Sequence, residues 1–372
     1  MLLSRPSAPW LLLALFLALA CDSSETATPD TLAVSPSTLD FGALTTGQTS
    51  SVQTIAVRNT GNATLTVTAL ILNGEGAGGF QLSAPALPFT LRPGLSETVE
   101  VVASPVVGGA FAATLTVESS HGTRTVALSG TATDPVSVTY LGNDGIMLAF
   151  EDKKVLIDAI HTNESPWVIL PTAERTKLLM GQPPYDGIDL ILITHNHGDH
   201  SNPTAINTVL MNNPGAWVIA PPQAQDGIEP ARLLPVNMTI FGSEGVAGAN
   251  DISLDILLMH HFDQFGNDFS NVQNYVYSVN LGGKNFLHVG DVEYETASFQ
   301  PFDLANRDIE VIFMPTFNTL ISAATRDLIN AQVAPAHIVA MHFFDVPNEV
   351  PQVQQLFPSA TLFTQAPTTI TF

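Results

Sequence analysis

The sequence predicts two folded domains in series, an all-β sandwich followed by an α/β domain with mixed sheets. Three observations support this. The chain has 372 residues, more than a single domain usually contains. Residues 31–133 consist of short alternating segments divided by turn residues, whereas strand-like and helix-like segments mix from residue 136 onward.

Short strands without any intervening helical stretch fill the first domain. Turn signals such as Asn59-Thr60-Gly61-Asn62 and Arg92-Pro93-Gly94 separate them. This regular spacing is typical of a sandwich of two sheets. The candidate strands are Thr31–Val34, Thr54–Arg58, Ala63–Leu72, Glu97–Ser104, Ala112–Glu118 and Arg124–Ser129.

The second domain, residues 134–372, begins with strands and continues with strands and helices. Pro203–Asn213 is a predicted helix, because proline is favoured in a first helical turn. Thr319–Ala331 and Val350–Phe357 are two further candidate helices. The candidate strands are Val136–Leu141, Gly145–Phe150, Lys154–Asp158, Ile188–Ile193, Trp217–Ala220, Ile252–Met259, Tyr275–Asn280, Asn285–Val289, Val311–Pro315 and His337–Met341.

The composition restricts the possible partners. Apolar residues make up 45% of the chain, and 34 Asp+Glu against 12 Lys+Arg give a formal net charge of −22. Such an acidic chain repels phosphate backbones, so we expect no nucleic-acid partner. It also disfavours electrostatic attachment to anionic lipid.

The first residues are typical of an export signal. Arg5 precedes the apolar run Trp10–Ala20, which is short for a membrane span. The run ends at Cys21, the only cysteine, so no intramolecular disulfide is possible. Residues 1–21 resemble a bacterial lipoprotein signal, which implies a lipid anchor on Cys21 in the cell envelope and a flexible tether over 22–30. An ordinary signal peptide with a cysteine near its cleavage site is the alternative.

A loop rich in metal-binding residues follows the buried strand Ile188–Ile193. In Thr194-His195-Asn196-His197-Gly198-Asp199-His200, three imidazoles and a carboxylate fall within six positions. Close spacing lets one loop surround a cation, and imidazole with carboxylate suits zinc.

This run resembles the His-x-His-x-Asp-His signature of the metallo-β-lactamase superfamily, and later segments resemble its other motifs in order. The resemblance implies an αβ/βα four-layer sandwich. It implies one metal site of His195, His197 and either His260 or His261, and a second of Asp199, His200 and His342. Asp291 would bridge the two ions. Because neighbouring strand residues face opposite ways, His260 and His261 share one ligand position. The resemblance of Leu257-Leu258-Met259 to the family's apolar strand end favours His261. Asp158 resembles a supporting aspartate, while a strand-capping role is the alternative.

The implied chemistry is hydrolysis. Two divalent ions, zinc first and manganese or iron as alternatives, would lower the pKa of a shared water from ~15.7 towards ~7 and so supply hydroxide. Asp199 is the candidate catalytic residue that orients this nucleophile. His197 stands where redox di-iron relatives carry glutamate, which favours a hydrolase. Met341-His342 resembles the ascorbate-6-phosphate lactonase-like branch.

The substrate is less defined. No cluster of Lys or Arg suggests a phosphate pocket, so a neutral ester, lactone or lipid-like small molecule is preferred, and a phosphodiester remains an alternative. The loops Gly242–Asn250 and Gly266–Gln273, with Phe262, Phe265, Phe269 and Phe343-Phe344, either line an apolar cleft or belong to the core.

Residues 31–133 resemble immunoglobulin-like domains related to the ASH domain, through Ser35–Gly42, Val57–Gly61 and Leu128–Thr131. That resemblance implies a fold and no chemistry. We expect a spacer, or a module that contacts an envelope protein or glycan. The alternative function for the whole chain is therefore an envelope-anchored binding or adhesion protein whose metal site is structural.

Overall fold

The computed structural model describes residues 31–162, 164–262, 269–316 and 321–372. These form two compact units, which we describe separately. The predicted signal 1–21, the tether 22–30 and Cys21 lie outside the described residues. No helix in the described part of the chain has the length and apolar character needed to cross a membrane.

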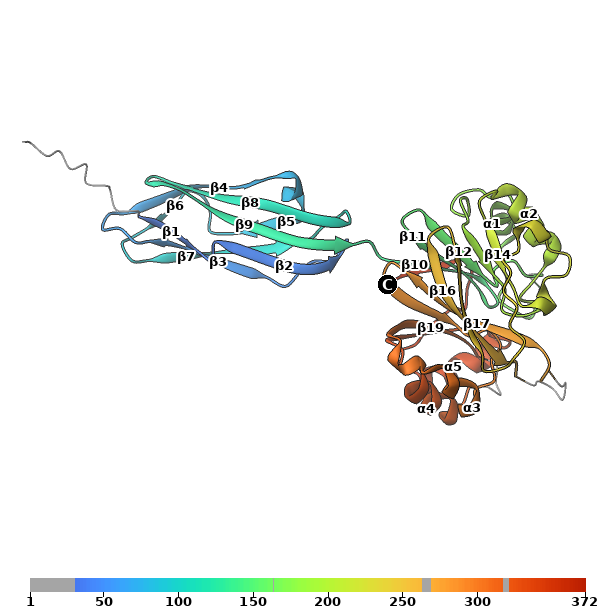
Figure 1. Ribbon diagram of the computed structural model, residues 1–372. Helices are drawn as coiled ribbons and strands as arrows, with labels where there is room; N and C mark the ends of the chain where they lie inside the picture. Colours follow the sequence, from blue (N-terminus) through green and yellow to red (C-terminus); the bar gives the residue numbers. More distant parts are fainter. Residues whose placement is uncertain (1–30, 163, 263–268, 317–320) are drawn as a thin grey trace, which may run out of the picture. The chain divides into compact units, whose positions relative to one another are not determined.

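Nine strands form two sheets of a sandwich in the first unit (Figure 1). One sheet has the order β1-β3-β7-β5 and the other β2-β9-β8-β4-β6. The strands are β1 Leu32–Ser35, β2 Thr38–Thr45, β3 Gln53–Asn59, β4 Leu65–Asn73, β5 Phe80–Ser83, β6 Phe89–Leu91, β7 Ser96–Ala103, β8 Gly109–Ser119 and β9 Gly122–Thr133.

Alternation along these strands explains why they pair face to face. In β3, Ile55 and Val57 are buried while their neighbours Thr54 and Ala56 are exposed, and β7 buries Val99 and Val101 in the same way. Side chains of successive strand residues point to opposite faces, so each sheet has one apolar face. The predicted all-β sandwich is confirmed.

The second unit is built on two further sheets. A six-stranded sheet has the order β14-β13-β12-β11-β10-β22, and a seven-stranded sheet runs from β15 to β21 in chain order. The strands are β10 Ser137–Gly142, β11 Gly145–Phe150, β12 Lys153–Ile157, β13 Leu190–Leu192, β14 Trp217–Ile219, β15 Glu244–Ala249, β16 Ile252–His260, β17 Gln273–Leu281, β18 Lys284–His288, β19 Ile309–Pro315, β20 His337–Met341, β21 Thr361–Leu362 and β22 Thr368–Thr371.

Three apolar clusters hold four layers together. Side chains of both sheets share the central cluster, with Leu190 and Leu192 on one side and Ile256 and Leu258 on the other. The opposite face of each sheet packs on helices, and Ile191 accordingly belongs to the cluster that includes α2. A third cluster joins the second sheet to α3, α4 and α5. The predicted αβ/βα four-layer sandwich is confirmed.

The helices depart from the prediction in four places. Neither α1 nor α3 was predicted, and α5 starts at Val346 rather than Val350. Ala323 starts α4, whereas the predicted residues Thr319–Leu320 lie outside the described residues. The bounds are α1 Thr172–Leu179, α2 Pro203–Asn212, α3 Thr296–Phe299, α4 Ala323–Gln332 and α5 Val346–Leu356, with 3₁₀ turns at Glu75–Gly79, Pro222–Ala224, Pro230–Arg232, Gln300–Phe302 and Leu304–Asn306.

The Gly-rich segment 242–250, predicted as a loop, is instead the edge strand β15. It pairs antiparallel with β16 from Glu244–Leu257 to Ala249–Ile252. Backbone pairing with a long buried neighbour outweighs the low intrinsic strand preference of glycine.

Candidate metal centre

The predicted ligands lie where strands of both sheets end. His195, His197, Asp199 and His200 occupy the loop after β13. His261 directly follows β16, Asp291 comes three residues after β18, and His342 directly follows β20. Loops at strand ends carry function while the sheets hold them rigidly.

Hydrogen bonds hold the loop after β13 in a tight turn. The backbone N–H groups of His200 and Ser201 both donate to the His197 carbonyl, at 3.0 and 2.9 Å. The Asn202 side chain then accepts from Ala205 N at 3.1 Å and so caps α2. The turn brings imidazoles that are close in sequence to one side of the loop.

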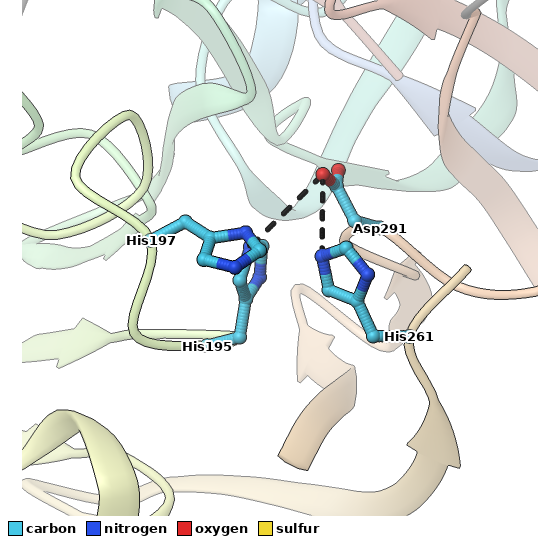
Figure 2. A group of neighbouring side chains, drawn as sticks. All are labelled: His195, His197, His261 and Asp291. Atoms are coloured by element: carbon cyan, nitrogen blue, oxygen red, sulfur yellow. Dashed lines mark hydrogen bonds and ion pairs between the residues drawn. The ribbon is translucent and has the colours of Figure 1, made fainter. Parts of the chain in front are cut away.

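A first group of ligands comprises His195, His197, His261 and Asp291 (Figure 2). One ligand atom from each lies within 4.8 Å of the others. His195 Nε2 is 3.1 Å from His197 Nδ1.

A second group comprises Asp199, His200 and His342, again within 4.8 Å of one another. His200 Nε2 and His342 Nε2 are 2.9 Å apart, and Asp199 Oδ2 lies 3.6 Å from His342 Nε2. Both groups match the two predicted ligand sets.

Asp291 lies between the groups and turns one oxygen to each. Its Oδ2 is 3.6 Å from His261 Nε2 and 4.0 Å from His195 Nε2. Its Oδ1 is 3.5 Å from both His200 Nε2 and His342 Nε2. This is the placement that a bridging carboxylate requires.

Gly290 allows Asp291 to reach this position. It has φ +55°, and a Cβ there would lie 2.6 Å from Asn274 Oδ1 and 2.8 Å from Thr194 Cβ. Any side chain would therefore push the strand end away from the loop that carries the histidines.

The two adjacent histidines diverge. His261 is buried in the first group, whereas His260 ends β16 and stacks on Phe241 with ring centroids 3.9 Å apart. Opposite side-chain directions of neighbouring residues cause this separation. His260 therefore lies outside both groups.

Burial sets most of the imidazoles in their neutral form. It lowers the pKa of His195, His197 and His261, and that of His342 to about 4. Neutral imidazole is the form that binds metal ions. In His200, burial also lowers the pKa, but the carboxylates of Asp291, Asp199 and Asp158 more than offset it and raise the pKa well above its ordinary value.

The hydrogen bonds behind the imidazoles leave lone pairs directed inward. His200 Nδ1 lies 2.8 Å from Asp158 Oδ2 and His261 Nδ1 2.6 Å from the Phe262 carbonyl, so both Nδ1 atoms donate. Their Nε2 atoms are then acceptors in neutral rings. His261 Nε2 is buried and finds no hydrogen-bond partner among the described residues.

These observations fit divalent metal ions. Facing nitrogens about 3 Å apart repel unless a cation or proton lies between them. Buried polar atoms without partners otherwise destabilise a fold, by roughly 1–3 kcal/mol each. Imidazole with carboxylate is the donor set of zinc and its neighbours.

Asp158 supports the centre from outside. Its Oδ1 accepts from Thr194 N at 2.8 Å, and its Oδ2 accepts from Thr194 Oγ1 at 2.5 Å and from His200. Carboxylates in this position orient a ligating imidazole.

Asp144, which lies on the turn between β10 and β11, was not among the predicted site residues. It comes within 3.8 Å of His200 Nδ1 and 3.7 Å of His288 Nε2. Burial raises the pKa of the Asp144 carboxyl well above its ordinary value, His200 opposes this, and Asp291 raises it further. The sequence signal was an acidic residue on a tight turn between two apolar strands.

Aromatic rings border the centre on two sides. Trp167 packs edge-on against His342 at 4.3 Å and against Phe344 at 5.2 Å, and Phe344 is 43% exposed. Phe269 contacts His197 at 4.9 Å. By contrast, Phe262 and Phe343 belong to the buried core, and Phe265 lies outside the described residues.

The four-layer fold and the convergent His and Asp side chains define this domain as a metallo-β-lactamase-type fold with a candidate metal centre. The family described as "Beta-lactamase superfamily domain" matches residues 137–342, and the chain belongs to this superfamily. Residues 30–131 match the "HYDIN/CFA65/VesB-like, Ig-like domain", which confirms the immunoglobulin-like fold of the first unit.

One named protein is similar to a short part of the chain. A "UPF0173 metal-dependent hydrolase" of Aeropyrum pernix is 34% identical over 83 residues, which cover 22% of this chain and 28% of that protein. The match thus spans little more than a quarter of that relative.

Two solved structures are similar to the chain at lower sequence identity. A possible metal-dependent hydrolase of Veillonella parvula is 16% identical to the chain, with a TM-score of 0.48 over 63% of this chain and 99% of that one. Igni18, a metallo hydrolase of Ignicoccus hospitalis, has 17% identity and a TM-score of 0.46 over 64% and 98%.

Proposed function

We propose that the protein is a dinuclear metal hydrolase of a neutral ester or lactone, with a phosphodiester as the alternative. The placement of Asp291, with one oxygen toward each histidine group, carries this proposal. Two bound ions, zinc first, would activate water and polarise the bond to be cleaved.

The residues of the centre would have different roles in hydrolysis. The two groups described above would hold the ions, and Asp291 would keep them close together. Asp199 has a side chain that is 25% exposed, so its carboxylate is accessible from solvent. It is placed to orient the reacting water and to accept its proton at a carboxylate oxygen.

The border of the centre favours an apolar substrate group. Trp167, Phe344 and Phe269 offer rings beside the ligands, and the net charge of −22 disfavours polyanionic substrates. The pair Met341-His342 supports a relation of the chain to the ascorbate-6-phosphate lactonase-like branch. For the substrate itself, we infer a molecule with an apolar acyl or alkyl group.

We further propose that the enzyme acts outside the cytoplasm. The lipoprotein-like signal 1–21 supports export and a lipid anchor on Cys21, with 22–30 as a tether. The immunoglobulin-like unit would then act as a spacer between anchor and catalytic domain, or contact an envelope protein or glycan.

Elemental mass spectrometry of the purified full-length chain tests the proposal. We expect about two divalent ions per chain, and fewer in His197→Ala. Wild type should then hydrolyse members of an ester, lactone and phosphodiester panel. A chain that binds no metal under metal-replete conditions, or a fully loaded chain that cleaves nothing in the panel, would overturn the proposal and favour the binding-protein alternative.

A further inference from the structure

Asp144 is a buried carboxylate whose oxygens lack hydrogen-bond partners among the described residues. The residue is 1% exposed, and neither Oδ1 nor Oδ2 has a hydrogen-bond partner in the described part of the chain. A buried carboxylate requires a counter-charge, a hydrogen-bond donor or a proton.

The backbone around Asp144 cannot easily turn the carboxylate toward water. Its carbonyl accepts from His288 Nε2 at 2.9 Å. The preceding Asn143 donates from Nδ2 to the Asp199 carbonyl at 2.5 Å, and its own carbonyl accepts from His342 N at 3.1 Å. The turn is thus tied to the strand end of β18 and to the backbone of two predicted ligands.

The nearest imidazoles are already engaged elsewhere. His200 Nδ1, 3.8 Å from Asp144 Oδ2, donates to Asp158 at 2.8 Å. His288 Nε2, 3.7 Å from the same oxygen, donates to the Asp144 backbone carbonyl. Neither N–H is available to the carboxylate.

Asp144 nevertheless lies within the metal centre. One ligand atom each from Asp144, His200 and Asp291 fall within 4.8 Å of one another, and Asp291 Oδ1 is also buried without a hydrogen-bond partner among the described residues. Two carboxylates with an imidazole form a donor set for a divalent cation.

We propose that Asp144 is an additional carboxylate ligand of the metal centre, on the side of His200 and Asp291. This inference rests on the metal centre of the proposed function. The ion on the side of His200 would then have one more carboxylate ligand than the predicted ligand set gives it.

Metal binding by apo protein provides the test. Full-length wild type and Asp144→Asn are dialysed against graded Zn²⁺, the bound ions are counted by elemental mass spectrometry, and the melting temperatures of the apo forms are compared. Asp189→Asn is the matched control, because its carboxylate accepts from Lys154 N at 2.9 Å at the opposite end of the strands.

We expect Asp144→Asn to bind one of the two ions about 10- to 100-fold more weakly. Its apo form should melt at or above apo wild type, because the substitution removes a buried carboxyl group that has no hydrogen-bond partner among the described residues. The control should bind both ions as wild type does. If Asp144→Asn does not fold, Asp144→Ser, which is smaller and also neutral, replaces it.

Unchanged affinity for both ions would overturn this inference while leaving the proposed function intact. A lower apo melting temperature with unchanged affinity would assign Asp144 a structural role, and would overturn it as well. Failure of wild type to bind any ion would instead overturn the proposed function.

Discussion

The two halves of the metal centre differ in what stands behind their imidazoles. In the first group, neutral oxygens contact the outer nitrogens: Thr194 Oγ1 lies 2.9 Å from His195 Nδ1, and the Phe262 carbonyl 2.6 Å from His261 Nδ1. In the second group, the Asp158 carboxylate binds His200 Nδ1 at 2.8 Å.

This difference has an electrostatic consequence. A carboxylate behind a ligating imidazole increases its basicity more than a carbonyl or hydroxyl does. His200 and His342 are also fully buried, whereas His197 is partly exposed. We therefore infer that the second group holds its ion more tightly.

Asp291→Ala should have the largest effect, because this carboxylate serves both halves. We expect both ions to be lost and hydrolysis to fall by on the order of 10³-fold or more. Elemental analysis, activity and circular dichroism measure this together. Retention of one ion at wild-type affinity would show that Asp291 belongs to one half alone.

The adjacent histidines give a matched pair for the first half. His261→Ala should release the ion of that half and lower activity by on the order of 10²-fold, whereas His260→Ala, which loses only its stacking on Phe241, should retain both ions. Metal counts of the two variants decide the outcome. Equal losses would contradict the separation of the two side chains.

Most residues of this centre were predicted from strand-end patterns together with the resemblance to the metallo-β-lactamase motifs. An apolar run that ends in polar residues marks a strand end, and strand ends of a mixed sheet bring distant residues together. His195, Asp291 and His342 each follow such a run. The alternation of strand side chains predicted that only one of His260 and His261 could be a ligand, and the resemblance to the family's strand end favoured His261.

Features that depend on tertiary contacts could not be predicted in this way. Asp144 is a candidate ligand only because it lies near His200 and Asp291, which are distant in sequence. Trp167 lies beside His342, which is also distant in sequence. β15 was missed because its Gly-rich sequence lacks strand preference and pairs through its backbone.

Asp158→Asn tests the second half. The amide keeps the shape but loses the charge behind His200, and we expect a 10- to 100-fold weaker affinity for the ion held by Asp199, His200 and His342. The affinity of the first half should change little. Competition with a chelating dye, which resolves two binding steps, measures both. A larger loss in the first half would reverse the inferred order of affinities.

Thr194→Val should have the smallest effect and concerns the first half. It removes the hydroxyl that lies between His195 Nδ1 and Asp158 Oδ2 but keeps the backbone bond from Thr194 N to Asp158 Oδ1. We expect the free energy of unfolding to fall by about 1–2 kcal/mol.

Because His200 retains its bond to Asp158, metal affinity should fall only a few-fold and mainly in the first half, where His195 loses its neutral partner. Urea unfolding of the apo protein separates the stability term from the binding term. If Thr194→Val weakened the second half as strongly as Asp158→Asn does, the hydroxyl rather than the carboxylate charge would be what orients His200.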